Sequence, residues 1–570
     1  MPSNALDDAL DDDAAALALP GGTVLVKAGE PATALYRLVA GRLAEVEQLT
    51  GDGERVIAVH RPGAVIGAAQ ILGDAVYGTT VTALRDSELL ALPLDRVETL
   101  LRDVPEFLAE VARAALTRLG AIVPADRRKS SILGFVAVCD GVAMRDLAER
   151  VAAAMRTLGS RVAVLGVEAD DSPPSRLSRL EAENDYVLLT AERREPDFAA
   201  FCGRQIDRLV LVGGADTPLP DAPITFAAAA IRRHRLLDFV LVQPHDARFP
   251  MDSDRWLSAA PASRLFQIRQ GDRADVERLA RLYAGRSVGL ALSGGGARAY
   301  AHVGVVRALG ELGVPIDIVA GTSMGAVIAA GHAMGWDIDE LDRRIREAFV
   351  ASSPLSDIAF PLLAMTRGGR VDQRLEAHFG ETRISDLWRP FSCVSTDLTT
   401  GAPHIHRQGL LRRALRASLS LPGVLPPVVE DGHVLVDGAL VGNLPVDLVG
   451  EQHDGMTIGV DVAVSRGIGP DDLRLRPSGW RWVTSGAWRR GPPIVSVLIR
   501  SATLPSATAT AAARDHRSVE IVPEVEGVEL RDWKAYDRAV DAGYRAAMAS
   551  AERLADLVAA RSPNQRPISN

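Results

Sequence analysis

The sequence predicts a multidomain α/β protein made of three successive units. At 570 residues the chain is too long for a single hydrophobic core, so about three domains are expected. Short apolar runs separated by glycine turns extend from Leu19 to Leu119, a rhythm typical of a β-barrel or jelly roll. Further on, strands alternate with helices, which indicates parallel α/β sheets. The predicted domains are residues 1–125, 131–270 and 286–570.

The first unit is predicted to be a β-barrel or jelly roll closed by helix. Glycine turns at Gly29, Gly41 and Gly63 separate its strands. Helical periodicity follows from Leu94 to Leu119. The predicted strands are Thr23–Val26, Ala34–Val39, Leu43–Val46 and Val56–Val59.

Two segments of this unit, Leu35–Gly41 and Pro62–Gly67, resemble the strand–turn pattern of cyclic-nucleotide-binding domains. In that family a glutamate of the phosphate cassette holds the ribose hydroxyl, and a later arginine pairs with the cyclic phosphate. Here Ala68 stands at the glutamate position and Gly78 at the arginine position. Loss of a guanidinium–phosphate pair removes a strong charge-assisted contact. The resemblance therefore implies a degenerate domain that serves docking, oligomerisation or another ligand, and cyclic AMP or GMP is not expected as its partner.

The second unit is predicted to be a Rossmann-like α/β domain. Its first strand runs into Cys139–Ala143, where a phosphate-loop protein would place its glycines and lysine. Because these residues are missing, the unit is interpreted as a scaffold without a cofactor. The predicted elements are strands at 133–138, 161–165, 185–190 and 207–212 and helices at 144–158 and 177–183.

Two glycine-rich motifs in the third unit predict acyl transfer. Gly321–Gly325 places Ser323 between two glycines, after an apolar strand and before a helix of small residues, as in a nucleophile elbow. Upstream, the loop Ser293–Arg298 follows the strand Val288–Leu292 and offers backbone amides for an oxyanion. A helix cap and a phosphate cradle are the structural alternatives. The loop lacks GxGxxG spacing and a Walker lysine, which disfavours nucleotide binding.

A serine nucleophile needs a base, and Asp437 is the first candidate. It ends an apolar strand and enters a glycine turn, where a simple Asx-turn is the alternative. A triad in the order Ser, Asp, His is also open, with His453 as its third member and His433 as a weaker candidate. Since an ordinary carboxylate is a weak base, Asp437 is expected to be partly buried, with a raised pKa.

Taken in order, these motifs resemble the three signatures of the patatin-like phospholipases. The resemblance runs from about Arg286 into the C-terminal region and includes Phe391–Gly401 and Arg416–Gly423. It implies a Ser-Asp dyad without histidine, with Ser323 as nucleophile and Asp437 as base. The amides of the glycine loop form the implied oxyanion hole, from Gly294, Gly295, Gly296, Ala297 and Arg298.

The order of the three units, with the segment 197–207, resembles the neuropathy target esterase branch of this family. Ala299 and Ala439 stand where the family commonly has glycine, a mild departure. The resemblance implies a lysophospholipase or phospholipase that releases fatty acid through an acyl-enzyme and uses no cofactor or metal. A regulatory or binding protein with an inactive hydrolase fold is the alternative.

Composition narrows the partners and the compartment. A net charge of −9 disfavours nucleic acid. The 3 cysteines lie far apart and the histidines are scattered, so neither a disulfide framework nor a zinc site is predicted. Few cysteines and an acidic start at Asp7–Asp13 favour the cytoplasm over secretion. No apolar run reaches the roughly 18 residues that span a bilayer. The expected partner is a lipid or lysolipid substrate. Peripheral membrane contact and oligomerisation remain open.

The region after the hydrolase motifs is less regular. Tryptophans and arginines alternate in the segment 466–493, interpreted as a surface subdomain with buried indoles. A membrane-interface patch is the alternative. A strand is predicted at 519–523 and one closing helix over Trp533–Leu557.

Overall fold

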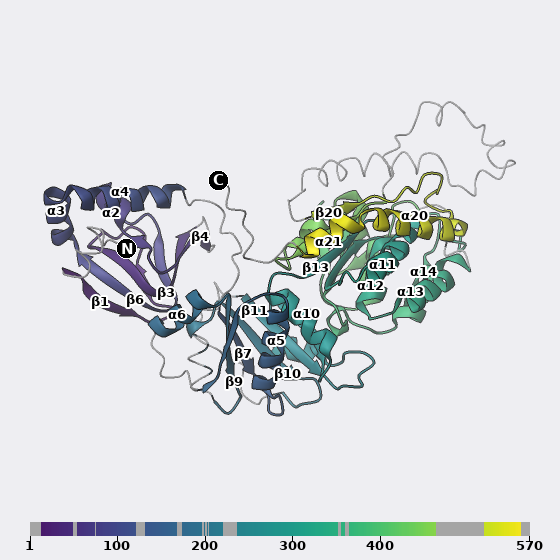
Figure 1. The fold of residues 1–570 in the computed structure, drawn as a ribbon. Coiled ribbons are helices and arrows are strands. Elements are labelled where there is room, and N and C mark those ends of the chain that lie inside the picture. The colour runs from purple at the N-terminus through teal and green to yellow at the C-terminus, as the bar shows by residue number, and fades with distance from the viewer. Residues whose placement is uncertain are drawn as a thin grey trace, which may run out of the picture. The chain divides into compact units, whose positions relative to one another are not determined.

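The computed structural model forms two compact units, residues 1–242 with 255–264 and residues 243–254 with 265–570 (Figure 1). No helix that it describes is long and apolar enough to cross a bilayer. The tryptophan-containing segment 466–493 lies outside the described residues. The structure describes residues 13–48, 54–73, 76–120, 132–167, 174–195, 199, 202, 204–219, 236–260, 262–351, 355–359, 364–462 and 518–559.

The first unit begins with an antiparallel β-roll whose strands lie in the order β1-β6-β3-β4. Strand β2 pairs with β6, and β5 pairs with β3. Along β6, buried side chains alternate with partly exposed ones, as expected for a strand with one face on the core. The bounds are β1 Ala15–Leu19, β2 Val24–Val26, β3 Ala34–Gln48, β4 Glu54–His60, β5 Val65–Ile66 and β6 Thr80–Pro93.

The turn predicted at Gly41 is wrong. The two strands expected on either side of it form the single strand β3, and Gly41 lies inside this strand. The pairing of β3 with β6 shifts register around Gly41, which has a φ of 98° and marks a β-bulge. A Cβ on Gly41 would lie 2.6 Å from Ser87 Cα, so close approach to β6 requires the glycine.

Three helices pack on the roll. The periodicity from Leu94 to Leu119 corresponds to two helices rather than one, because Pro105 starts α4 and cannot continue α3. Leu35, Leu92 and Phe107 are fully buried where these helices meet the strands. The bounds are α2 Ala68–Leu72, α3 Leu94–Asp103 and α4 Pro105–Gly120.

The remainder of this unit contains a parallel sheet, in agreement with the predicted alternation. Within the unit its strands run in the order β11-β10-β7-β9-β8. Strands β7 and β9 are buried along their whole length, as parallel strands covered on both faces must be. The elements are β7 Ile132–Ala137, α5 Met144–Thr157, β8 Val162–Leu165, α6 Pro174–Glu183, β9 Tyr186–Ala191, β10 Arg208–Gly214 and β11 Leu236–Gln243.

The second unit is built on a mixed sheet in the order β17-β18-β15-β14-β13-β19-β20, with β16 beside β15. Strands β15, β14, β13, β19 and β20 are parallel, whereas β16 and β18 run antiparallel to β15. The strand bounds are β13 Val288–Leu292, β14 Ile318–Thr322, β15 Phe391–Asp397, β16 Pro403–His406, β17 Val428–Glu430, β18 His433–Asp437, β19 Met456–Val460 and β20 Ser518–Ile521.

Helices connect the strands of this sheet. Strands β13 and β14 each lead into a helix at the same sheet edge, which brings the two glycine motifs together. Helix α20 lies beside α11 (Figure 1). The single closing helix predicted over Trp533–Leu557 is instead divided into a 3-10 turn, α20 and α21, with a break at Ser550. The main helices are α10 Arg273–Tyr283, α11 Ala301–Glu311, α12 Met324–Ala333, α14 Gly369–Phe379, α15 Leu411–Ser418, α20 Tyr536–Ala549 and α21 Ala551–Ala559.

Candidate active site

Ser323 occupies a strained turn between β14 and α12. Its φ of 55° and ψ of −128° are values that residues with side chains rarely adopt. Helix α12 begins at Met324, so the serine stands at a helix N-terminus, where the partial positive charge favours developing negative charge. This is the strand–turn–helix geometry that the sequence predicts.

The hydroxyl of Ser323 donates a hydrogen bond to Asp437, with 2.6 Å between Oγ and Oδ2. Asp437 is the last residue of β18, and 2% of its surface is exposed. Its other oxygen, Oδ1, accepts the backbone N–H of Ala439 at 2.9 Å. The Asx-turn contact and the contact to the serine therefore coexist on one carboxylate.

Burial raises the pKa of Asp437 to about 6. Removal of the carboxylate from water disfavours its charged form, and the hydrogen bonds from Ser323 and Ala439 offset this effect only in part. The direction agrees with the expectation from sequence. A carboxylate with this pKa is ionised at neutral pH and is a stronger base than an exposed aspartate.

The glycine loop runs directly past the nucleophile, since a Cβ on Gly294 would lie 3.0 Å from the Cβ of Ser323. Of the five amides that the sequence assigns to the oxyanion hole, three already donate to protein acceptors. These are Gly294 to Asn443 Oδ1 at 3.1 Å, Ala297 to Leu530 O at 2.9 Å and Arg298 to Gly295 O at 3.1 Å.

The amides of Gly295 and Gly296 have no acceptor within the part of the chain that the structure describes. Gly296 has a φ of 55°, and a Cβ there would lie 2.3 Å from the carbonyl oxygen of Leu530. Only glycine fits this position without displacing the backbone. The loop that passes Ser323 at Gly294 therefore offers two open amides at its next two residues.

Two serines of the segment 416–423 accept hydrogen bonds from the backbone of Ser323 and Asp437. The hydroxyl of Ser418, at the end of α15, accepts the backbone N–H of Ser323 at 2.8 Å. The carbonyl of Ser420 accepts the backbone N–H of Asp437 at 2.9 Å. Neither serine is among the site residues predicted from sequence, and the sequence signal for both is that this segment belongs to the family resemblance.

Neither candidate histidine joins the serine–aspartate pair. His453 Nδ1 lies 2.9 Å from the hydroxyl of Ser287, which precedes β13, at the opposite end of that strand from the glycine loop. His433 Nδ1 lies 2.9 Å from Asp397 Oδ2. Among the described residues, no group of three or more His, Cys, Asp and Glu side chains is arranged to hold a metal ion.

Comparison with protein families yields two matches. The patatin-like phospholipase model matches residues 290–449, which include the glycine loop, Ser323 and Asp437. The cyclic nucleotide-binding domain model matches residues 17–103 in the β-roll.

Similar proteins occur in bacteria and animals. An NTE family protein of Mycobacterium bovis is 33% identical over 559 residues, which cover 95% of this chain and 92% of that protein. Patatin-like phospholipase domain-containing protein 6 of Mus musculus is 26% identical over 93% of this chain and 44% of its own length. Neuropathy target esterase sws of Drosophila melanogaster is 28% identical over 82% of this chain and 37% of its own length.

Proposed function

This chain belongs to the NTE family, and we propose that it is a serine esterase that hydrolyses the acyl esters of lysophospholipids or phospholipids. The observation that carries the proposal is the 2.6 Å contact between Ser323 Oγ and Asp437 Oδ2 at a strained elbow. The lipid substrate class follows from the family. Peripheral contact with a lipid surface is part of the proposal, because such substrates reside in membranes and micelles.

In the proposed reaction, Asp437 accepts the hydroxyl proton of Ser323 while Oγ attacks the ester carbonyl carbon. The resulting oxyanion is held by the amides of Gly295 and Gly296, and each such donor lowers the barrier by about 3 kcal/mol. Collapse of this intermediate breaks the ester bond, and the leaving alcohol takes the proton from Asp437. Water then loses a proton to Asp437 and attacks the acyl carbon, and the bond from this carbon to Ser323 Oγ breaks as Oγ takes the proton back from Asp437, which releases the fatty acid and restores the enzyme.

A fluorophosphonate probe tests whether Ser323 is an activated nucleophile. Wild type is expected to be labelled, and Ser323→Ala is expected to remain unlabelled. Ser420→Ala is a matched control, because it removes a hydroxyl that contacts Arg416 and keeps the backbone carbonyl that accepts from Asp437. If wild type were unlabelled, or if Ser323→Ala were labelled equally, the esterase proposal would be wrong, and a binding protein with an inactive hydrolase fold would be favoured.

A second comparison separates the dyad from a triad. Asp437→Asn is expected to abolish hydrolysis, whereas His453→Ala is expected to retain it. Thermal unfolding of both variants first checks that they are folded. If only the histidine variant loses activity, the dyad is wrong.

An assay of wild type on lysophospholipids, diacyl phospholipids and short esters tests the substrate class. Faster release of fatty acid from a short ester than from every lipid would exclude a lipid-specific enzyme.

A further inference from the structure

A cavity of about 250 Å³ lies at the opposite end of β14 from Ser323. Residues 315–317, which lead into β14, line one side of it, and Gly335, which follows α12, lines another. The pair Trp388–Arg389, just before β15, and residues between Arg269 and Arg281, before and along α10, complete the wall. The cavity is therefore separate from the serine–aspartate pair.

The charged side chains around this cavity carry one positive charge in excess. Four arginines line it, together with three aspartates. The arginines are Arg269, Arg278, Arg281 and Arg389, and the aspartates are Asp272, Asp275 and Asp317.

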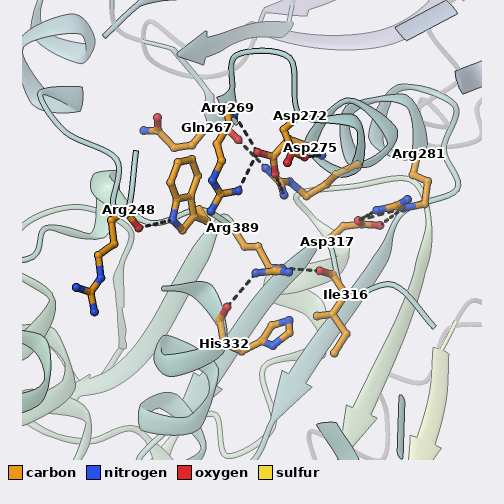
Figure 2. A network of polar contacts seen from close by, with 12 residues as sticks. Arg248, Gln267, Arg269, Asp272, Asp275, Arg281, Ile316, Asp317, His332 and Arg389 are labelled. Carbon is orange, nitrogen blue, oxygen red and sulfur yellow. Dashed lines mark hydrogen bonds and ion pairs between the residues drawn. The ribbon is translucent and has the colours of Figure 1, made fainter. Parts of the chain in front are cut away.

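Three of the arginines pair with buried carboxylates (Figure 2). Arg281 Nη2 lies 2.7 Å from Oδ1 of Asp317, which has no exposed side-chain surface. Arg278 Nη1 and Arg269 Nη1 approach the two oxygens of Asp275 at 2.7 and 3.0 Å. These pairs hold the guanidinium groups in place and leave one positive charge, which the third aspartate, Asp272, balances.

Arg389 supplies the charge that is left over. Its Nε donates to the carbonyl of Ile316 at 3.0 Å and its Nη1 to the carbonyl of His332 at 3.1 Å, and both acceptors are neutral (Figure 2). Burial and the neighbouring arginines lower the pKa of Arg389 to about 10, against the opposing effect of the nearby aspartates. At neutral pH the group remains a cation on the cavity wall, and an anion there would compensate it.

Arg269 provides a second donor at the cavity. Its guanidinium lies over the ring of Trp388, 3.5 Å from the ring centroid, which restricts the orientation of its planar fork. The side chain retains 29% exposure, so part of the fork stays accessible. A fixed guanidinium fork matches the geometry of phosphate oxygens.

We propose that this cavity is a binding site for a phosphate group, held by Arg389 and Arg269. The volume lies just below the roughly 300 Å³ at which pockets for larger ligands begin. The ligand is therefore inorganic phosphate or a small phosphomonoester rather than a nucleotide. This proposal does not depend on the esterase activity, because the cavity and Ser323 lie at opposite ends of β14.

Calorimetric titration of the full chain with inorganic phosphate, glycerol 3-phosphate and acetate tests the site. One phosphate per chain is expected to bind wild type. Arg269→Gln should weaken this affinity at least about tenfold, because a charge-assisted contact is lost. Arg273→Gln is the matched control, since it removes the same charge four residues further along the chain, at a side chain that is 91% exposed and paired with Glu277. Its affinity should equal that of wild type.

Arg389→Met should likewise weaken phosphate binding at least about tenfold. Arg389 donates hydrogen bonds to the end of α12 and to the segment before β14, so its loss could unfold the protein. Thermal unfolding and fluorophosphonate labelling check that this variant is folded. If it is not folded, Arg269→Gln alone tests the phosphate site. Tighter binding of glycerol 3-phosphate than of phosphate would identify a phosphomonoester site, and equal affinities a site for inorganic phosphate. The proposal is overturned if neither ligand binds, if Arg269→Gln binds like wild type, or if acetate binds as tightly as phosphate.

Discussion

The hydroxyl of Ser418 accepts the backbone N–H of Ser323 at 2.8 Å and donates to the carbonyl of Val394 at 2.6 Å. A side chain from the end of α15 thus satisfies the amide of the one residue at this site with a strained backbone. The contact fixes the elbow conformation in which Ser323 Oγ reaches Asp437. Ser418 is therefore a positioning residue for the nucleophile.

Ser418→Ala is expected to lower kcat about tenfold or more while KM changes little, because a buried amide loses its acceptor and the elbow relaxes. Ser418→Thr keeps the hydroxyl and should recover most of the rate. Ser420→Ala serves as control, since its hydroxyl contacts only Arg416 among the described residues. Equal kcat values for Ser418→Ala and Ser420→Ala would remove the positioning role.

Reaction rate should follow the protonation of Asp437. Its pKa of about 6 means that the base is protonated and inactive below this pH and ionised above it. The rate constant for labelling of Ser323 by the fluorophosphonate should rise about tenfold per pH unit below 6 and level off near neutrality. A profile that is flat from pH 5 to about 7 would show that another group activates the serine.

Asp437→Asn should lower the reaction rate and raise the stability of the folded protein at neutral pH. Loss of a general base lowers the rate by about 10²–10⁴-fold. The folded-state pKa of about 6 lies above the ordinary value of 3.8, so ionisation penalises the folded protein as pH rises through this window. The penalty is absent below pH 3.8 and approaches about 3 kcal/mol at neutral pH.

Denaturant unfolding of wild type and Asp437→Asn at several pH values measures this difference. The variant should gain stability relative to wild type between about pH 4 and 7, and the two should converge in acid. The inferred burial cost would be contradicted if the stability of wild type relative to the variant were higher at pH 7 than at about pH 4.

Gly296→Ala should abolish activity, because its Cβ would meet the carbonyl of Leu530 at 2.3 Å and the φ of 55° strains any larger residue. The loop would have to move, and with it an amide of the oxyanion hole. Gly310→Ala on α11 is the control, since a Cβ there meets no atom within 4 Å. Helix propensity predicts that this control is as stable as wild type or more stable. Retained activity in Gly296→Ala would exclude this amide from the reaction.

The β-roll is expected not to bind cyclic AMP. Thr79, which follows Gly78, donates a hydrogen bond to the buried side chain of Glu45, so an acidic group, and not an arginine, occupies the surroundings of the position where the family places its cation. Glu45 also contacts His60 Nε2 at 3.1 Å. Calorimetric titration should give no binding at micromolar cyclic AMP, and a micromolar Kd would show that another cation holds the phosphate.

Local patterns predicted the elements of the site well. The strand Val288–Leu292 has the predicted bounds, and the elbow and the end of β18 at Asp437 lie where apolar runs meet glycine. Local patterns were wrong at Gly41, because a glycine with positive φ serves equally in a turn and in a bulge. They also missed the break at Ser550, since helical periodicity continues on both sides of it.

By itself, the sequence determined the order of the units and the chemistry of a serine, a carboxylate and a glycine loop, because these depend on residue type and short spacing. Only the tertiary structure decided which groups meet. It paired Ser323 with Asp437 and placed His453 beside Ser287. It also gathered four arginines around one cavity and, among the described residues, left the amides of Gly295 and Gly296 without an acceptor. Those relationships join residues that are distant in the chain, and the sheet order that brings them together follows from packing of the whole core.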